Sequence, residues 1–317
     1  MNLSFLIPTK NRPEALKKNI DSIIKLNLLD IDYEILVLDD GSIKDYSSVV
    51  SKYNFITYFK NEYSLGISGV RNKLASLAKG KYLIFLDDDV EIDKNLNLST
   101  LFELFESNVK LALIAFNITA FFNTEYHIKD NSNLVNSKSK PIKQIPFNKY
   151  HLYFDSSLIK NISFVSYFIG AAFACRKSLF DKNIHFDELF LWGNEELDFS
   201  YNIIKHNYEL IFHPEFRANH FPLKSVIDDN DNNLNSLNLF IANRILTAYK
   251  NLSLVYAISY IFIWTTYYLL VSIIKFRLKD WFIGIKLGIR KTMQSNRNPL
   301  SKKHMLYLKN NFGRIFY

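Results

Sequence analysis

The sequence predicts an α/β fold with a mostly parallel sheet, because short apolar runs alternate with helical patterns. The runs are residues 3–7 (LSFLI), residues 34–38 (EILVL) and Tyr82–Leu86 (YLIFL). Each run has the length of a buried strand, and apolar residues between the first two recur at helical spacing. Strand–helix–strand alternation of this kind is typical of a parallel sheet with crossover helices.

Prolines and glycines mark where the expected strands and helices begin and end. The first strand is expected to stop at Pro8, and Pro13 suits the first turn of the next helix. Residues 64–69 (SLGISG) open a further helical segment over residues 70–78. The polar stretch at residues 123–149 is expected to be a surface loop.

The second half of the chain is less regular. Residues 163–175 are apolar and are expected to be buried, and residues 192–205 are expected to be a loop that enters a helix. Residues 208–212 (YELIF) form the last expected strand, which is expected to end at His213-Pro214. Residues 228–233 (DDNDNN) are expected to be a flexible break.

Charge is concentrated near the end of the sequence. The 317 residues include 39 Lys/Arg and 31 Asp/Glu, a net charge of +8, yet residues 275–317 alone hold 11 basic residues and one acid. A basic segment behind an apolar stretch indicates an anionic membrane surface as partner, whereas a nucleic-acid enzyme usually carries basic charge around its groove. We therefore expect no nucleic-acid partner. The single cysteine, Cys175, excludes a disulfide scaffold.

The apolar stretch covers residues 252–274, 23 residues without a charge, which is long enough to cross a bilayer. A single span would put the basic segment and the rest of the protein on opposite sides of the membrane, and residues 281–293 are too short and too charged for a second span. We therefore predict amphipathic helices that lie in the cytosolic leaflet. The alternatives are helices that pack on the first domain or form a homodimer.

The start of the sequence (MNLSFLIPTKN) does not read as a signal peptide, so we expect the protein at the cytoplasmic face of the plasma membrane. The sequence thus divides into two expected parts. Residues 1–227 form a catalytic domain, and residues 228–317 a helical, basic, membrane-associating region.

Three adjacent carboxylates, Asp87-Asp88-Asp89, follow the strand Tyr82–Leu86 directly. Ligands bind at the carboxyl edge of open α/β sheets, and oxygen ligands suit Mg²⁺ or Mn²⁺. Alternate residues of an extended chain point the same way, so Asp87 and Asp89 are expected to share a face while Asp88 points elsewhere. Simple capping of a solvated turn is the alternative.

Further polar groups complete the expected site. Glu195 and Glu196, in the segment 192–198 (WGNEELD), are candidates for a general base or for helix capping, and Trp192 for an apolar platform under a sugar. Arg71 suits a diphosphate or a surface ion pair. The other candidates are His220 as a ligand and, for hydrogen bonds to a nucleobase or ribose, the loop Pro8-Thr9-Lys10-Asn11-Arg12 with Asp39.

Together these motifs resemble glycosyltransferase family 2, which has the GT-A fold. The resemblance covers residues 1–222 and rests on these segments: residues 6–9 (LIPT) with Asn11-Arg12, residues 37–42 (VLDDGS), Arg71-Asn72, residues 81–90 (KYLIFLDDDV), residues 170–173 (GAAF), residues 192–200 (WGNEELDFS) and His220.

The resemblance implies a nucleotide-sugar donor, Mn²⁺ or Mg²⁺ as cofactor, and inversion at the anomeric carbon. Asp39 matches the position that contacts the nucleobase. The triplet matches the metal and ribose motif, with Asp89 as the direct ligand, and His220 a further metal or diphosphate contact. Glu196 matches the catalytic base, but the family often has Glu-Asp where this chain has Glu195-Glu196, so Glu195 stays a candidate.

The donor side is therefore expected to involve residues of the first half and the acceptor side the loop before the glutamates. The expected donor-binding residues are Pro8, Thr9, Asn11, Arg12, Asp39, Arg71, Asp87 and Asp88; the expected metal ligands are Asp89, Asp87 and His220; and the expected acceptor-binding residues are Trp192, Gly193 and Asn194.

We expect an inverting glycosyltransferase that acts on a saccharide or lipid-linked acceptor in surface polysaccharide synthesis. One alternative is transfer of a sugar to polyprenyl phosphate. The other is a membrane-associated binding protein that has lost catalysis.

Overall fold

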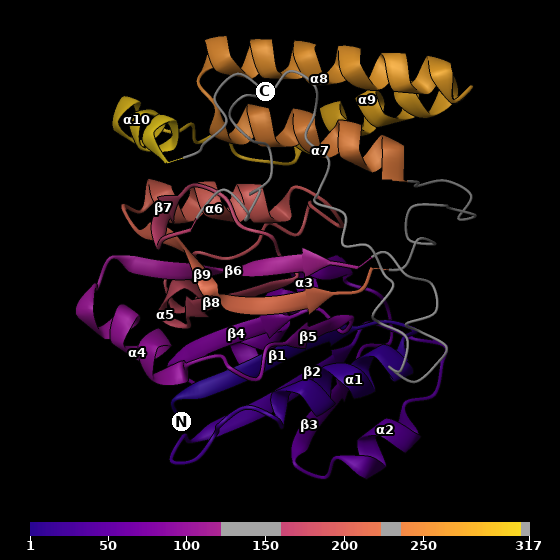
Figure 1. Ribbon diagram of the computed structural model, residues 1–317. Coiled ribbons are helices and arrows are strands. Elements are labelled where there is room, and N and C mark those ends of the chain that lie inside the picture. Colours follow the sequence, from indigo (N-terminus) through magenta and orange to yellow (C-terminus); the bar gives the residue numbers. More distant parts are fainter. Residues whose placement is uncertain (122–159, 223–235, 312–317) are drawn as a thin grey trace.

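The computed structural model describes residues 1–121, 160–222 and 236–311. The surface loop expected at residues 123–149 and the break expected at residues 228–233 lie outside these ranges. Within them, nine strands form one sheet in the order β3-β2-β1-β4-β8-β6-β9-β5, and β7 also pairs with β9 (Figure 1). The strands are β1 (Leu3–Thr9), β2 (Tyr33–Asp39), β3 (Ile56–Lys60), β4 (Tyr82–Leu86), β5 (Val90–Ile92), β6 (Leu111–Ala120), β7 (Ser163–Val165), β8 (Ala172–Arg176) and β9 (Glu209–His220).

Helices cover both faces of this sheet and form a further layer beyond it. They are α1 (Pro13–Ile23), α2 (Ser47–Lys52), α3 (Gly66–Leu77), α4 (Leu98–Ser107), α5 (Ser178–Asp181), α6 (Glu195–Lys205), α7 (Ser236–Asn251), α8 (Leu254–Ile274), α9 (Leu278–Met293) and α10 (Lys302–Asn310).

The strands β2, β1 and β4 run parallel, as the sequence predicts, and β3, which the sequence does not predict, pairs parallel with β2. The first strand continues past Pro8 to Thr9, so the expected stop at the proline is wrong. The strand β4 pairs with β1 only as far as Leu6, and Pro8 therefore lies where β1 has a partner on one side alone. A residue without an N–H is tolerated at such a position.

The other half of the sheet is mixed, because β8 runs antiparallel to both β4 and β6. The expected end of the last strand at His213-Pro214 is also wrong, since β9 continues to His220. Its pairing with β6 jumps from His213 to Arg217, so Pro214 lies in a bulge and no ladder hydrogen bond is lost.

Strand residues alternate between two hydrophobic clusters, one on each face of the sheet. Leu6, Leu83 and Phe85 pack with α3 and α6 on one face. Phe5 and Ile84 pack with α1, α2 and α4 on the other face. The sheet is therefore buried on both sides, which leaves its edge of strand ends as the place for polar chemistry.

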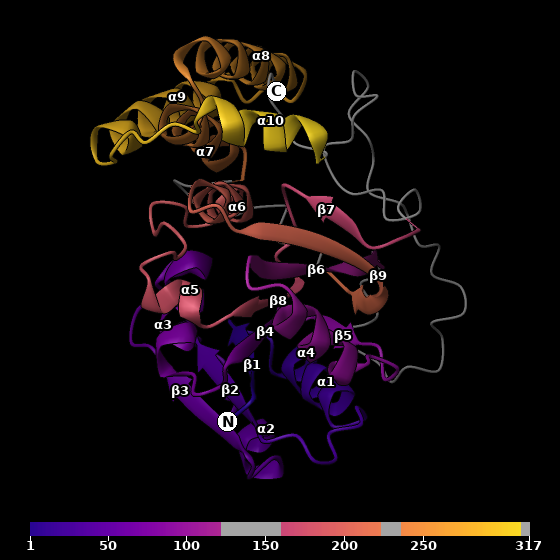
Figure 2. The same ribbon diagram turned by 90° about the vertical axis from the view of Figure 1, so that its left-hand side faces the viewer.

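The C-terminal helices form a layer above α6, on the side away from the sheet (Figures 1 and 2). Tyr260, Trp264 and Leu308 belong to the same hydrophobic cluster as the sheet residues under α6. Of the described helices, α8 alone is long and apolar enough to cross a membrane, judged by length and composition. Within the most apolar 18 residues of α8, only 22% are buried inside the protein.

Candidate functional site

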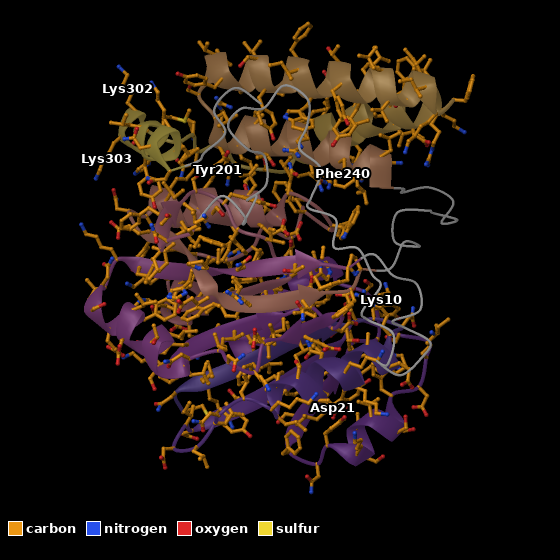
Figure 3. The ribbon with its side chains drawn as sticks, viewed as in Figure 1. Lys10, Asp21, Tyr201, Phe240, Lys302 and Lys303 are labelled. Atoms are coloured by element: carbon orange, nitrogen blue, oxygen red, sulfur yellow. The ribbon has the colours of Figure 1, made fainter. Side chains whose placement is uncertain are left out.

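A cavity of about 470 Å³ opens at the carboxyl edge of the parallel strands. Figure 3 shows Lys10, from the loop after β1, on this side of the molecule, whereas Lys302 and Lys303 of α10 lie at the opposite end. Eleven of the residues that line the cavity are Pro8, Thr9, Lys10, Arg12, Arg71, Asp87, Leu191, Trp192, Glu195, Glu196 and His220. Segments far apart in the sequence thus meet at one opening, as the family resemblance implies.

Within the acid triplet, Asp87 and Asp89 point to one side and Asp88 to another, as expected for alternate residues of an extended chain. Asp87 and Asp89 point toward a common place, where one ligand atom from each lies within 4.8 Å of the other and of a His220 nitrogen. Asp88 is fully buried, and its Oδ2 accepts a 2.6 Å hydrogen bond from Thr9 Oγ1 while its Oδ1 lies 2.8 Å from Arg12 Nη2. Burial raises the pKa of Asp88 to about 7, with Asp89 acting in the same direction and Arg12 opposing it.

The position of His220 follows from strand pairing. The end of β9 pairs antiparallel with β5, and Val90 is the partner of His220. Because β5 begins directly after the triplet, His220 Nε2 lies 3.2 Å from Asp89 Oδ1. Burial lowers the pKa of His220, but the Asp89 carboxylate outweighs it and brings the pKa above its usual range.

Arg71 joins the triplet to the glutamate pair. Its guanidinium is buried and lies 3.1 Å from Asp87 Oδ1 and 3.2 Å from Glu195 Oε1, and Nη2 also donates to the Gly170 carbonyl at 3.0 Å. Burial lowers the pKa of Arg71, and the surrounding carboxylates raise it by more, so Arg71 stays charged. The alternative of a surface ion pair is wrong, since the side chain is 2% exposed.

Gly170 leaves room for both groups. A Cβ at this position would lie 2.7 Å from Glu196 Oε1 and 2.8 Å from Arg71 Nη2, closer than real Cβ contacts. The Gly170 N–H donates to Glu196 Oε1 at 3.2 Å. The glycine of the GAAF motif therefore fixes the glutamate against the arginine.

The two glutamates differ in their surroundings. Glu195 is 4% exposed; its Oε1 accepts from Arg71, and its Oε2 is buried without a hydrogen-bond partner. Burial and the neighbouring Glu196 raise the pKa of Glu195 to about 8. Glu196 is only partly buried, and burial likewise raises its pKa. The accessible carboxylate is therefore that of Glu196.

The loop before α6 is held by α7, a contact that the sequence does not reveal. Trp192 lines the cavity and packs on Phe240, whose ring centroid lies 5.1 Å away. Asn243 Nδ2 donates to the carbonyls of Trp192 and Gly193 at 2.8 and 2.7 Å, and Asn194 Nδ2 donates to Thr247 Oγ1 at 3.3 Å. These helix residues carry no motif, so pattern reasoning could not find them.

Three expected donor-binding residues, the buried Asp88 together with Asp39 and Asn11, do not line the cavity in the described structure. The carboxylate of Asp39 is fully buried, where it accepts from the Ser42 N–H and from Tyr58 Oη, both at 2.8 Å. Asn11 has a φ of 58° and its Oδ1 accepts from the Ile43 N–H at 2.9 Å. Asp39 and Asn11 shape the loops at the cavity mouth.

Comparison with known proteins places this geometry among the glycosyltransferases. The family model described as "Glycosyl transferase family 2" matches residues 4–182. An uncharacterized glycosyltransferase of Methanocaldococcus jannaschii is 30% identical over 50% of this chain and 56% of its own length. A GalNAc(5)-diNAcBac-PP-undecaprenol β-1,3-glucosyltransferase of Campylobacter jejuni is 32% identical over 61% of this chain and 57% of its own length. The chain thus spans little more than half of these relatives.

Solved structures confirm the fold. TarS of S. aureus (residues 1–349) superposes with a TM-score of 0.56 at 16% identity, over 82% of this chain and 69% of TarS. GalNAc-T7 gives a TM-score of 0.58 at 19% identity, over 78% of this chain and 47% of the other. These likenesses confirm the predicted GT-A fold, and the family model matches more than half of the sequence. The chain therefore belongs to glycosyl transferase family 2.

Proposed function

We propose that the protein transfers a sugar, with inversion, from a nucleotide-sugar donor to a lipid-linked or saccharide acceptor. The observation that carries the proposal is that Asp87, His220 and Glu196 line one cavity, with Asp89 beside them. Relatives support the substrate classes: TarS structures contain UDP or UDP-GlcNAc, and the Campylobacter jejuni relative is named for an undecaprenol diphosphate acceptor.

The donor set fits a divalent cation. Asp87, Asp89 and His220 offer two carboxylates and an imidazole within 4.8 Å of one another, a combination that suits Mn²⁺ and, through the oxygens, Mg²⁺. GalNAc-T7 was solved with UDP, GalNAc and Mn²⁺. When bound, such an ion supplies positive charge for a departing diphosphate.

Side chains of the protein supply the remaining chemistry. Arg71 lies at the cavity wall between Asp87 and Glu195, where its fixed positive charge stabilises negative charge on a leaving diphosphate. Glu196 removes the proton from an acceptor hydroxyl, and its raised pKa brings it closer to neutral pH, where a general base is most effective. Attack from the face opposite the diphosphate inverts the anomeric carbon.

A donor screen tests this proposal. The full chain is incubated with UDP-, GDP- or dTDP-sugars, Mn²⁺ and undecaprenyl-diphosphate-linked saccharides, and product is followed by mass spectrometry. We expect transfer from one donor, loss of transfer with EDTA, and recovery with Mn²⁺. If the protein binds a nucleotide but neither transfers nor hydrolyses the sugar of any donor, the result would favour a binding protein instead.

The membrane surface belongs to the same proposal, with residues 1–227 as the catalytic domain and residues 228–317 as the membrane-associating region at the cytoplasmic face. Large apolar side chains of this region are exposed on α8 and beyond: Leu254, Val255, Ile258, Phe262, Leu270, Ile273, Ile274, Phe276 and Phe282. Basic side chains are exposed nearby: Lys275, Lys279, Lys286 and Arg290. Exposed apolar area beside basic charge suits anionic lipid.

Vesicle binding tests the membrane contact. We expect the full chain to sediment with vesicles of phosphatidylglycerol and phosphatidylcholine, and less with phosphatidylcholine alone. Phe262→Asp should reduce binding, since the side chain is 68% exposed and its replacement leaves the interior packing intact. Val109→Asp is the matched control, because Val109 is 78% exposed and lies in the catalytic domain. Equal binding of the Phe262→Asp protein would contradict this membrane face.

A further inference from the structure

The loop Trp192-Gly193-Asn194 sets where the glutamate pair begins, because α6 starts at the next residue. Gly193 and Asn194 both have left-handed backbone conformations, with φ of 81° and 70°. Asn194, the N-cap residue, makes no side-chain capping bond to its own helix. The conformation of the loop therefore depends on contacts from outside it.

Those contacts come from one face of α7. Phe240, Asn243 and Thr247 lie three and four residues apart, so they project from the same side of the helix. Phe240 packs on Trp192 and lies 3.1 Å from the position of a Cβ on Gly193. Asn243 is fully buried, and its single amide donates to the carbonyls of both Trp192 and Gly193.

The amide of Asn243 is oriented in turn by Lys291 of α9. Lys291 Nζ donates to Asn243 Oδ1 at 2.7 Å, which leaves only the amide nitrogen to face the two carbonyls. The reversed amide would set its oxygen against two carbonyl oxygens and its NH₂ against the amine. Lys291 is 5% exposed, and burial lowers its pKa to about 8, although Asp187 acts the other way.

Close packing brings Lys291 to this place. Helix α9 lies against α7 through two glycines, where an added Cβ on Gly284 would be 2.8 Å from Ile241 Cβ, and one on Gly288 2.7 Å from Ile245 Cδ1. The outer side of α9 exposes Phe282 to solvent. A helix of the surface layer therefore reaches the loop before Glu196 through two buried side chains.

We propose that Asn243, oriented by Lys291, is a positioning residue that fixes the acceptor side of the cavity and makes it depend on the packing of α9 against α7. The proposal rests on the proposed function for its catalytic consequence. Its structural consequence, a loop fixed by Asn243, stands apart from that function. Neither side chain touches the expected metal ligands.

The test replaces Asn243 by aspartate, which keeps the size and the Lys291 partner but removes both N–H donors. Asn202→Asp is the control for the change of amide to carboxylate, because Asn202 is partly exposed on α6 and lies outside the contact between α7 and α9. Hydrogen exchange of residues 192–197 is measured by mass spectrometry. Transfer kinetics use the donor and undecaprenyl-linked acceptor that the wild-type protein accepts.

We expect exchange of residues 192–197 to become at least about tenfold faster in Asn243→Asp, and the control to stay near wild type. Transfer should fall by about 10- to 100-fold, with a raised KM for the acceptor, while Mn²⁺-dependent affinity for UDP stays unchanged. Lys291→Met should show the same pattern at smaller amplitude, because the amide keeps its donors but loses its orientation.

Unchanged exchange in residues 192–197 of Asn243→Asp, or transfer equal to wild type, would overturn the inference. Equal loss of UDP affinity and transfer would also overturn it, since a general structural defect gives that result. If Asn243→Asp does not fold, Lys291→Met decides by the same criteria. A wild-type protein that transfers no sugar would refute the proposed function, yet the exchange measurement would still report on the loop.

Discussion

Replacing Glu196 by glutamine removes one carboxylate and leaves the rest of the cavity in place. Glutamine has the same length and keeps an oxygen that can accept from the Gly170 N–H, which now donates to Glu196 Oε1 at 3.2 Å. The side chain of Glu196 is partly exposed, so it contributes less to interior packing than the buried side chain of Glu195. We therefore expect Glu196→Gln to fold with wild-type stability.

Its activity should fall steeply. A positioned general base contributes about 10²- to 10⁴-fold in rate, equivalent to about 3–5 kcal/mol of transition-state free energy. Glu195 cannot take over, because its carboxylate is buried and faces Arg71. Removing the charge of Glu196 also lowers the pKa of Glu195, since the two carboxylates repel each other.

Steady-state transfer with the preferred donor gives the test, and Glu195→Gln is the matched control. We expect kcat to fall by about 10²- to 10⁴-fold in Glu196→Gln with the Kd for UDP unchanged, and by less than about tenfold in Glu195→Gln. Turnover of Glu196→Gln close to that of the wild type would refute the assignment. The opposite ranking of the two variants would assign the base to Glu195.

Three further predictions concern Arg71 and Gly170 at the cavity and Lys205 at the end of α6. Arg71→Met should lower the free energy of unfolding by about 1–3 kcal/mol in urea titrations, because Glu195 and the Gly170 carbonyl lose a buried hydrogen-bond donor while Glu195, whose pKa is already raised, stays neutral; an undiminished midpoint would contradict this. Gly170→Ala should reduce kcat and also weaken UDP binding, because the new Cβ would lie 2.7 Å from Glu196 Oε1 and 2.8 Å from Arg71 Nη2 and displace both; wild-type kcat would show that the loop adjusts freely. Burial lowers the pKa of Lys205 from 10.5 to about 8, so between these values the unfolded chain binds a proton that the folded chain does not, and stability gains with rising pH. Lys205→Met should therefore raise the melting temperature at pH 7, and this gain should shrink above pH 8; a gain that does not depend on pH would be inconsistent with the shift.

Local chemistry made the first half of the fold predictable. The strand Tyr82–Leu86 is observed with the predicted bounds, and the division of Asp87 and Asp89 from Asp88 follows from the alternation of an extended chain. The helix after Pro13 begins at that proline, as expected. In each case the deciding interactions lie within a few residues of one another.

Tertiary pairing decided what the sequence left open. Pro214 reads as a strand end, yet a bulge against β6 lets β9 continue to His220. Among the strands that the sequence does not predict, β3 is a half-exposed edge strand whose side chains carry no clear alternation. The link from Lys291 to Asn243 joins residues 48 positions apart, and nothing in their local sequence distinguishes them from other polar helix residues.

For the C-terminal helices, too, the sequence does not show which side chains are buried and which are exposed. The apolar residues 252–274 suggest a membrane helix, and composition alone does not reveal that Tyr260 and Trp264 pack into the cluster shared with the sheet. The same helix exposes Phe262 and Ile258 on its outer side. Packing on the protein on one side and exposed apolar side chains on the other are compatible with the proposed helix in one leaflet.

Mn²⁺ binding, followed by the electron paramagnetic resonance signal of the free ion, tests most directly whether cation, donor and base share one cavity. We expect wild type and Glu196→Gln to bind Mn²⁺ alike in the presence of UDP, and Asp89→Asn to bind it at least about tenfold more weakly, while both variants lose transfer. Wild-type Mn²⁺ affinity in Asp89→Asn, or full transfer in that variant, would contradict a metal site at Asp87, Asp89 and His220.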